Sequence, residues 1–307
     1  MALIASCIRS MVTAAPGRTL VWADFAQIEA RVLSWLAGSQ PRLAVFSSGE
    51  DVYTHTASAM FGKPVSDIAK DSEERFLGKT AELALGYQGG AKAFLKMAEN
   101  FGASIPEDRA EEIKNAWRET NPEIAGYENG FWVSMERATA AAVKNPGSIY
   151  SVSDRRIRFK TEGRWLLMRL PSGRRIRYLD PEVRDSETVY DHHTRRRMPV
   201  DPDTGLTYMG INTYTRQWTR CQTYGGKLTE NVVQGISFDL QAEAMLRMRD
   251  RGLDLVAHVH DEAIAECDER VAQEVHDAMM ECMLDLPPWA TGLPVAAEGV
   301  IAKRYRK

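Results

Sequence analysis

The stretch TLVWADFAQIEARVLSWLAG, residues 19–38, places an apolar strand directly before a helix. The run from Thr19 to Phe25 predicts a buried strand that ends near Asp24. Ile28, Val32 and Leu36 then recur at a spacing of four, which predicts a helix over residues 27–37 with one packed face. Gly38 supplies the helix stop. The strand therefore carries a carboxylate to its own end.

A second carboxylate is delivered in the same way near the other end of the chain. Residues 253–267 form two apolar runs that meet at His260-Asp261, which predicts a β-hairpin with acidic residues at its tip. Two carboxylates on one sheet can hold two Mg²⁺ ions roughly 3.5–4 Å apart, the arrangement that nucleotidyl transfer uses. The structural alternatives stay open: Asp24 could cap the following helix, and Asp261 could be an ordinary turn residue.

A third feature is the run Arg75, Lys79, Leu83 and Tyr87, again at a spacing of four. On a helix these side chains share one stripe, with successive members about 6 Å apart along the axis. The two cations could bind a triphosphate, and Tyr87 at the helix end could stack on a base. The alternative is an amphipathic helix with a solvated basic edge.

The remaining patterns give the organisation of the chain. Residues 41–130 are mainly helical in pattern, 145–208 alternate like β-hairpins or long surface loops, and 214–250 are helical again. A last helix is expected from Arg270 to Leu284, before Pro287-Pro288. No internal repeat or low-complexity segment stands out.

Composition bounds the class of protein. The chain has 307 residues, 44% of them hydrophobic, and is long enough for one large domain or two smaller ones. Its four cysteines show no CxxC spacing, so we expect neither a disulfide framework nor a zinc site. No apolar run approaches the ~20 residues of a membrane span. These features predict a soluble, cytoplasmic protein in a reduced setting.

Charge is unevenly distributed. The net charge is −3, which by itself argues against a nucleic-acid partner. However, residues 155–198 hold thirteen Arg or Lys against six Asp or Glu, and residues 303–307 add four more positive charges. The basic stretch is either a solvated surface or a face that neutralises phosphates.

Three segments together resemble the ordered motifs of family A DNA polymerases, the DNA polymerase I type. They are DFAQIEARVLSWLAG from residue 24, RFLGKTAELALGY from residue 75 and VHDE from residue 259. The similarity is best to phage members, through IRSMVTAAPG, TYGGKLTENVVQ and the ending KRYRK, and it covers nearly the whole chain. It implies an α+β fold in which an antiparallel palm sheet carries Asp24 and Asp261. The implied organisation is palm at 1–38, mainly helical fingers at 39–206 with an arginine-rich insertion at 145–206, and palm again at 207–307.

The resemblance also implies a role for each matching residue. Asp24, Asp261 and the Phe25 carbonyl would bind the two Mg²⁺ ions, with Glu262 supporting the site and Arg31 either beside it or in a structural ion pair. The groups around the nucleotide would be Gln27, Glu29, Arg75, Lys79, Leu83 and Tyr87; Lys79 would donate a proton, and Glu29 with Tyr87 would exclude a 2′-hydroxyl. Gln234 and His260 would contact the primer–template.

Some positions depart from the family pattern. Leu83 stands where Phe or Tyr is usual, so sugar discrimination at that position does not carry over. Tyr53 replaces a triphosphate-contacting histidine, and His55 is expected to be a surface residue rather than its substitute. The segment 145–208 is longer than the bacterial counterpart. Family members place an exonuclease domain, a thumb and part of the palm before the matching segment, so a split gene or a truncated one is expected.

The implied activity is template-directed DNA synthesis, with primer–template DNA and deoxynucleoside triphosphates as partners. A second polypeptide carrying the thumb and 3′–5′ exonuclease would be a further partner. Two other functions stay open. A single-subunit RNA polymerase shares the acidic motifs, although Glu29 argues against it, and a non-catalytic DNA-binding remnant would keep the fold without the reaction.

Overall fold

The computed structural model describes residues 9–184, 188–191, 196–199, 205–213 and 215–306. The chain divides into two compact units. Residues 1–32 and 234–307 form one, called here the terminal unit because both ends of the chain contribute to it, and residues 33–233 form the central unit. Two helices run through the division: α2 (Ile28–Ala37) and α10 (Gly225–Asp250).

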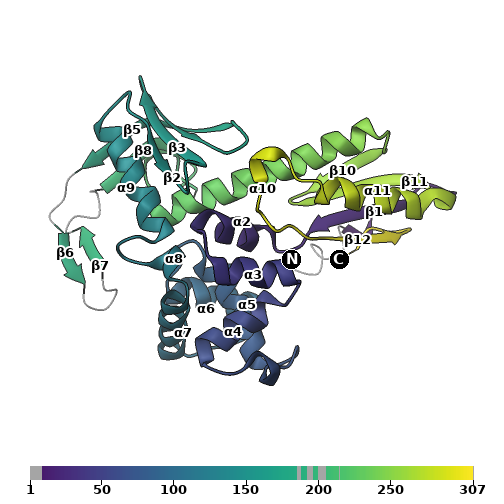
Figure 1. The fold of residues 1–307 in the computed structure, drawn as a ribbon, viewed down its shortest axis with the longest axis horizontal. Coiled ribbons are helices and arrows are strands. Elements are labelled where there is room, and N and C mark those ends of the chain that lie inside the picture. The colour runs from purple at the N-terminus through teal and green to yellow at the C-terminus, as the bar shows by residue number, and fades with distance from the viewer. Residues whose placement is uncertain (1–8, 185–187, 192–195, 200–204, 214, 307) are drawn as a thin grey trace. The chain divides into compact units, whose positions relative to one another are not determined.

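The terminal unit is built on a four-stranded antiparallel sheet. Its strands, in spatial order, are β10 (Leu255–Val259), β11 (Glu262–Asp268), β1 (Arg18–Phe25) and β12 (Ala297–Ala302). Helix α11 (Ala272–Leu284) packs on β1, β11 and β12, as Figure 1 shows. The β1 strand lies between two neighbours, which explains why its residues are apolar almost throughout.

A small aromatic cluster fixes one side of this sheet. Leu20 and Trp22 of β1 and Ile264 of β11 are buried together with Tyr305. The rings of Trp22 and Tyr305 meet edge to face, with centroids 5.4 Å apart, an arrangement that aromatic pairs prefer. The cluster joins the last residues of the chain to its first strand.

The first part of the central unit is helical, as the sequence predicted for residues 41–130. Ser39 precedes α3, Asp51 caps α4 through the Tyr53 amide, and Ser72 caps α5 through the Arg75 amide. The helices are α3 (Gln40–Ser48), α4 (Val52–Phe61), α5 (Glu73–Leu85), α6 (Ala91–Asn100), α7 (Glu107–Thr120), α8 (Pro122–Ala125) and α9 (Phe131–Lys144).

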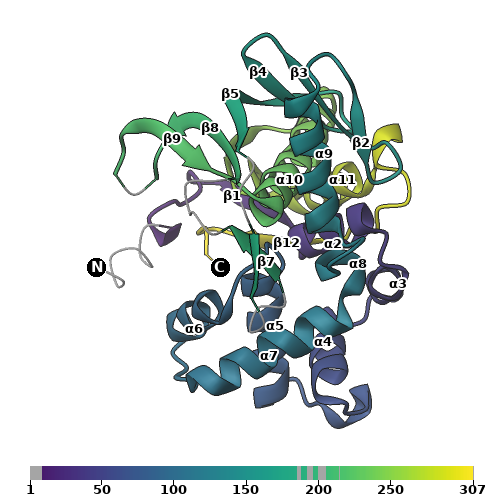
Figure 2. The ribbon, with the colours of Figure 1, turned by 90° about the vertical axis from the view of Figure 1, so that its left-hand side faces the viewer.

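The second part of the central unit is a six-stranded antiparallel sheet in the order β2-β3-β4-β5-β8-β9. Helix α9 packs against β2, β3 and β5 (Figure 2). A separate two-stranded ribbon pairs β6 with β7. The strands are β2 (Tyr150–Val152), β3 (Ile157–Glu162), β4 (Trp165–Arg169), β5 (Arg175–Arg184), β6 (Thr188–Asp191), β7 (Arg196–Pro199), β8 (Gly205–Ile211) and β9 (Trp218–Gln222).

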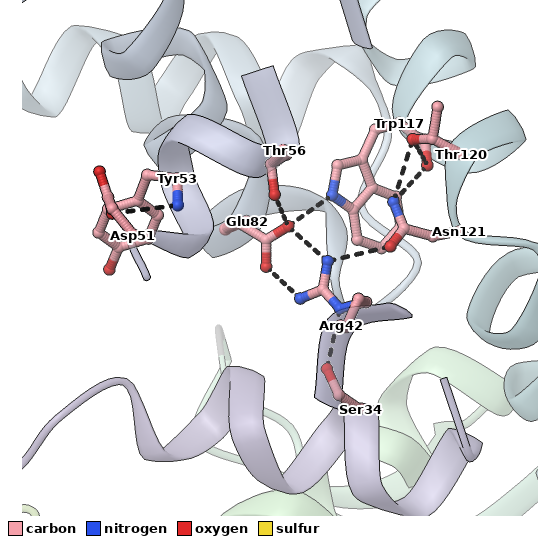
Figure 3. A network of polar contacts seen from close by, with 9 residues as sticks. All are labelled: Ser34, Arg42, Asp51, Tyr53, Thr56, Glu82, Trp117, Thr120 and Asn121. Carbon is pink, nitrogen blue, oxygen red and sulfur yellow. Dashed lines mark hydrogen bonds and ion pairs between the residues drawn. The ribbon is translucent and has the colours of Figure 1, made fainter. Parts of the chain in front are cut away.

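A buried polar network holds α5 in the helical part (Figure 3). The Arg42 guanidinium donates to both carboxylate oxygens of Glu82, at 2.8 and 2.5 Å. Thr56 and Trp117 also donate to Glu82, at 2.8 and 3.1 Å. Arg42 donates further to Ser34 and Asn121. Burial opposes both charges, but the pairing outweighs it, so the pKa of Arg42 is raised and the pKa of Glu82 is lowered.

Most predictions about the elements are confirmed. The α+β class, the strand ending near Asp24, the helix over 27–37, the β character of 145–208 and the hairpin over 253–267 are all present. The last helix is present as well, although it starts at Ala272 after a 3₁₀ turn over Glu269–Val271. Within the described residues, no helix is long and apolar enough to span a membrane.

One prediction about the elements is wrong in part. Residues 218–222 form strand β9 and not part of the helix expected over 214–250, and α10 begins only at Gly225. Residues 297–302 form the edge strand β12, which the sequence analysis did not predict. Tyr214 and, within the predicted insertion 145–206, residues 185–187, 192–195 and 200–204 lie outside the described part of the chain.

Candidate active site

The two predicted aspartates lie at the same end of neighbouring strands. Asp24 is the next-to-last residue of β1, opposite Glu262 in the register with β11. Asp261 belongs to the two-residue turn between β10 and β11, and its carbonyl accepts a hydrogen bond from the Phe25 amide at 3.3 Å. The sequence prediction that both acids reach one sheet is therefore confirmed. Helix α2 begins at Ile28, so Asp24 is not at its N-cap position.

The hairpin turn has an unusual backbone. His260, the first turn residue, adopts φ of 54°. Positive φ is uncommon outside glycine, although histidine visits this region more often than most residues. The turn places His260 on the surface and leaves Asp261 half-buried. A strained residue beside two carboxylates is consistent with a functional turn.

Glu262 is held by two contacts that the sequence did not indicate. Its side chain is only 2% exposed, and the Tyr305 hydroxyl donates to its carboxylate. The Gln241 amide of α10 donates to the Glu262 carbonyl at 3.1 Å. Burial, and then the bond to Glu262, raise the pKa of Tyr305 to about 12, so the hydroxyl keeps its proton. Glu262 is therefore a fixed buried acid beside the Asp24–Asp261 pair.

The donor atoms suit a hard divalent cation. Asp24 and Asp261 carry carboxylates, and the backbone of Phe25, which is hydrogen-bonded to Asp261, carries a carbonyl oxygen. Mg²⁺ prefers oxygen ligands and is commonly held by one or two protein carboxylates together with substrate phosphates. Across the described residues, no group of three or more His, Cys, Asp or Glu gathers as a metal cluster. The predicted set has two such side chains, so Mg²⁺ binding stays a prediction.

Other predicted residues surround this end of the terminal unit. Gln27 has φ of 54° and immediately precedes α2. Glu29 lies in the first turn of that helix, and the Gln234 amide of α10 donates to its carboxylate at 2.6 Å. The predicted nucleotide contact and the predicted primer–template contact thus bind each other directly.

The buried side chain of Arg31 joins two backbone segments. Its side chain is 5% exposed, and it donates to the carbonyls of Ala26 and Pro294 at 2.8 and 3.2 Å. Burial lowers the pKa of its guanidinium. These bonds tie the segment between β1 and α2 to the segment before β12. Both bonds go to backbone carbonyls, so the two roles that the sequence left open for Arg31 stay predictions.

The predicted triphosphate-binding residues lie on α5 of the central unit. Arg75 donates to Asp51 at 2.5 Å, and its guanidinium lies 5.6 Å from the Tyr53 ring centroid. The Lys79 ammonium lies 5.2 Å from the ring centroid of Phe101. Both cations are half-buried on the same stripe, as their spacing predicted.

The other two residues of the stripe, Leu83 and Tyr87, lie in the last turn of α5 and just beyond it. Leu83 is 42% exposed, and Tyr87 lies two residues beyond the last residue of α5. His55, expected at the surface, is half-buried and contacts Glu50 at 2.5 Å between side-chain atoms. Because Leu83 is exposed on α5, a nucleotide bound beside this helix can contact its side chain.

Asp51 was not among the predicted site residues. It caps α4, accepts from the Thr54 hydroxyl at 2.7 Å and binds Arg75. Burial opposes its charge, but the bonds from Thr54 and Arg75 outweigh burial and lower its pKa. Its signal in the sequence was its place two residues before Tyr53, in the segment where family members carry an acid and a histidine.

Two glycines allow α10 to approach the end of α5. The Gly226 amide donates to the Gln88 side chain at 2.8 Å, and the Gly225 amide donates to Glu136 at 3.0 Å. A Cβ atom at Gly226 would lie 2.3 Å from the Tyr87 carbonyl oxygen, far inside contact distance. Gly226 therefore fixes the backbone at Tyr87, and Gly225 joins α10 to α9.

Comparison with known proteins agrees with the motifs. A sequence profile of DNA polymerase family A matches residues 4–169. The described fold is also that of a polymerase domain: the POL domain of Pol1 from M. smegmatis, solved in complex with DNA primer-template and dNTP, matches with a TM-score of 0.60 and 19% identity. That match covers 97% of this chain and 42% of the other. The chain belongs to DNA polymerase family A.

The curated relatives point the same way. The DNA polymerase of Bacillus phage SP02 is 36% identical over 306 residues, which is 99% of this chain and 44% of that protein. The thermostable DNA polymerase I of Thermus thermophilus is 26% identical over 293 residues, 94% of this chain and 27% of that protein. The chain thus spans less than half the length of these relatives.

Proposed function

We propose that this protein is a template-directed DNA polymerase that joins deoxynucleotides to a primer 3′-hydroxyl. The observation that carries the proposal is the placement of Asp24 and Asp261 at one end of adjacent strands. Membership of family A, together with this pair of carboxylates, supports nucleotidyl transfer over a merely structural role. The terminal unit would be the palm, and the helical part of the central unit would be the fingers.

The chemistry needs oxygen ligands more than it needs reactive side chains. Asp24, Asp261 and the Phe25 carbonyl would hold two Mg²⁺ ions, which when bound lower the pKa of the primer hydroxyl and neutralise the triphosphate. Glu262 would support the site from a fixed, buried position, because Tyr305 and Gln241 hold it. The end of the sheet that carries Asp24, Asp261 and Glu262 would thus hold cations next to a phosphate.

The other predicted residues would select and align the nucleotide. Arg75 and Lys79 would bind the triphosphate, with Lys79 protonating the leaving oxygen. Because Asp51 holds Arg75, its carboxylate would keep the guanidinium in position for the triphosphate. Closure of α5 over the substrate could then limit the rate. Glu29 and Tyr87 would crowd the 2′ position and so favour deoxynucleotides.

The proposed partners are primer–template DNA and deoxynucleoside triphosphates, and the matched Pol1 domain was solved in complex with both. Gln234 and His260 would contact the DNA. A second polypeptide that carries a thumb and a 3′–5′ exonuclease stays a prediction of the family resemblance.

Primer extension with Asp24→Ala and Asp261→Ala tests the proposal. Each variant should lose on the order of a thousandfold or more in extension rate, because a bound metal ion contributes several kcal/mol to such a transition state. Asp277→Ala, which removes an exposed acid from α11, is the matched control and should extend normally. Circular dichroism should show that all three variants keep the fold.

The same assay separates the alternatives. Undiminished extension by Asp24→Ala or Asp261→Ala would exclude the two-metal site. A preference of the unmodified protein for ribonucleotides would indicate an RNA polymerase. Glu29→Ala should raise ribonucleotide incorporation if Glu29 excludes the 2′-hydroxyl. DNA binding without extension, with and without a thumb-bearing partner, would indicate a non-catalytic remnant.

A further inference from the structure

Three arginines lie side by side on neighbouring strands of the central sheet. In the antiparallel register, Arg158 of β3 is opposite Arg169 of β4, and Arg169 is opposite Arg175 of β5. Directly opposite residues point to the same face of a sheet, with Cβ atoms about 5 Å apart. All three side chains are exposed. The row therefore concentrates three guanidinium groups on one surface.

The next rows continue this face. Lys160 is opposite Leu167, which is opposite Arg177. One row further, Trp165 is 40% exposed, between Glu162 and Leu179. The alternate residues of the same strands, such as Phe159 and Met168, are buried, and α9 packs against β3 and β5 (Figure 2). The basic residues and Trp165 thus form the outer face of the sheet, called here the arginine face.

A row of like charges, directly opposite one another on paired strands, lowers the stability of the sheet unless an opposite charge compensates it. The chain as a whole has a net charge of −3, so the cluster is not a consequence of a basic composition. Glu162 lies within these rows: it accepts from Lys160 at 2.5 Å and also attracts Arg175, so one negative charge stands against the cations Arg158, Lys160, Arg169, Arg175 and Arg177. Asp180 accepts from Arg164 at 2.7 Å. Repulsion within the row is best relieved by an external anion.

We propose that the arginine face binds the backbone of single-stranded nucleic acid, with Trp165 as a stacking platform for a base. Guanidinium groups form paired hydrogen bonds with phosphates, and an exposed indole stacks on any base. A cationic surface interrupted by an aromatic ring suits a flexible single strand whose bases are accessible. The proposal rests on the proposed function only in that a DNA polymerase handles an unpaired template. The face itself lies wholly in the central unit and needs none of the acidic residues.

Fluorescence anisotropy of a labelled oligothymidylate of about 20 nucleotides tests this, with EDTA present and no dNTP. The variant R158Q/R169Q/R175Q should bind on the order of tenfold more weakly at about 50 mM salt than the unmodified chain. Its plot of log affinity against log salt should be shallower by about 2, since each phosphate contact to a single strand contributes about 0.7.

The control R249Q/R251Q/R270Q removes three exposed arginines from the terminal unit and changes the net charge equally. It should keep the affinity and the salt slope. Equal losses in both triple variants would show that only net charge matters and would overturn the proposal, as would unchanged binding by R158Q/R169Q/R175Q.

Trp165 gives a second test that net charge cannot explain. Trp165→Leu should weaken oligothymidylate binding about fivefold or more, because stacking on an aromatic ring is lost, and Trp165→Phe should restore most of it. A photoreactive amino acid at Leu167, between Lys160 and Arg177, should crosslink to the oligonucleotide. Absence of that crosslink, with binding intact, would place the strand elsewhere and overturn the proposal.

Two further measurements distinguish nucleic-acid binding by the arginine face from the proposed polymerase activity and from binding to an anionic membrane. Asp24→Ala should abolish primer extension yet bind oligothymidylate normally, so failure of the proposed activity and failure of the arginine face are distinguishable. Vesicles containing phosphatidylserine should not bind the chain. Binding of vesicles that is lost in R158Q/R169Q/R175Q, without oligonucleotide binding, would show an anionic membrane surface as the partner and would overturn the proposal.

Discussion

Tyr305 links the end of the chain to the acidic tip, and its hydroxyl is bonded to the buried carboxylate of Glu262. Tyr305→Phe keeps the ring against Trp22 but removes the donor, leaving a buried acid with one bond fewer. We expect the free energy of unfolding to fall by about 1–3 kcal/mol, the cost of an unsatisfied buried polar group. Urea denaturation of both proteins measures this. An unchanged midpoint would show that Glu262 finds another donor.

The same hydroxyl gives a pH dependence. The pKa of Tyr305 is about 12 in the folded protein and about 10 in an unfolded chain, so the folded state favours the neutral form. This stability is fully present below pH ~10 and is lost as pH rises towards 12. The free energy of unfolding should therefore fall over that interval, and Tyr305→Phe should fall less steeply. Burial also raises the pKa of Tyr178, which stays in the variant, so part of the slope remains.

Asp51 holds Arg75 and caps α4 at once, and the two roles can be separated. Asp51→Asn keeps a capping side chain but loses the charge that holds the guanidinium. If the carboxylate positions Arg75 for the triphosphate, KM for dNTP should rise while kcat stays within about twofold. Steady-state extension at varied dNTP measures both. A fall in kcat alone would mean that Asp51 acts through stability.

Asp51 also makes the stability of the fold depend on pH on the acid side. Its folded pKa is lowered, so its contribution is present above the unfolded value near 4 and is lost as pH falls below it. The Asp51→Asn variant should lose this part of the acid dependence. Melting temperatures between pH 3 and 7 would show it as a shallower acid limb.

Site residues that lie beside a local sequence pattern could be predicted. Contacts between residues far apart in the sequence could not. Asp24 and Asp261 were found because each follows an apolar run, which is a local signal. Tyr305 meets Glu262 across 43 residues, and Arg42 meets Glu82 across 40, with no local pattern to announce either pair. Such contacts appear only once helices and strands are packed.

At the scale of elements, the buried Arg42–Glu82 pair joins α3 to α5, while Ser34, Thr56 and Trp117 bring in α2, α4 and α7. Removing one charge leaves the other charge buried without its partner. Arg42→Met or Glu82→Leu should each cost about 3–5 kcal/mol of unfolding free energy. The double variant should cost clearly less than the sum, because no uncompensated charge remains.

A double-mutant cycle by urea denaturation measures the coupling of this pair. The exposed pair Arg251–Glu281 is the control, and its variants should change stability little. Additive losses at Arg42 and Glu82 would show that the two side chains act independently. In addition, since α5 carries Arg75 and Lys79, the single variants should raise KM for dNTP.

The start of α10 depends on a close approach. Gly226→Ala places a methyl group against the Tyr87 carbonyl and the Gln88 side chain, so the backbone there must move. We expect a loss of about 1–3 kcal/mol, typical of overpacking, together with weaker discrimination between deoxynucleotides and ribonucleotides. Alanine at Gly252, which follows α10 and meets nothing within 4 Å, is the steric control, although its φ of 77° adds some strain. Equal sugar discrimination in both variants would contradict a role for Gly226 in placing Tyr87.

The elements that sequence reasoning missed share a physical cause. Strand β9 pairs with β8, and β12 pairs with β1 from the other end of the chain. Neither TRCQ within β9 nor AEGVIA in β12 has a strong strand pattern of its own, and Gly299 is unfavourable in a strand. Tertiary pairing decides these strands. In contrast, the helix over 27–37 has a clear period and a glycine stop, so it was predicted correctly.

At the scale of the whole molecule, the terminal unit is assembled from both ends of the chain, whereas the central unit is one continuous segment. Strand β1 comes from the first part and lies between β11 and β12, which come from the last part. The sheet that carries the two aspartates therefore cannot form until the intervening 33–233 segment has been made. The central unit has its own helices and its own sheet, so it has no such requirement.

Deletion of the residues before Ile28 tests this asymmetry. The truncated chain loses the inner strand of the terminal sheet, leaving β11 and β12 without the partner between them, and we expect the terminal unit to unfold. Hydrogen exchange should show amides of β11 and α11 exchanging freely, while those of β3, β4 and α9 stay protected. Primer extension should vanish, and oligothymidylate binding by the arginine face should persist. Asp24→Ala in the full chain is the control, because it removes the activity but keeps every strand and its protection. Loss of protection throughout the truncated chain would mean that α2 and α10, which run through both units, make folding of the whole molecule a single cooperative event.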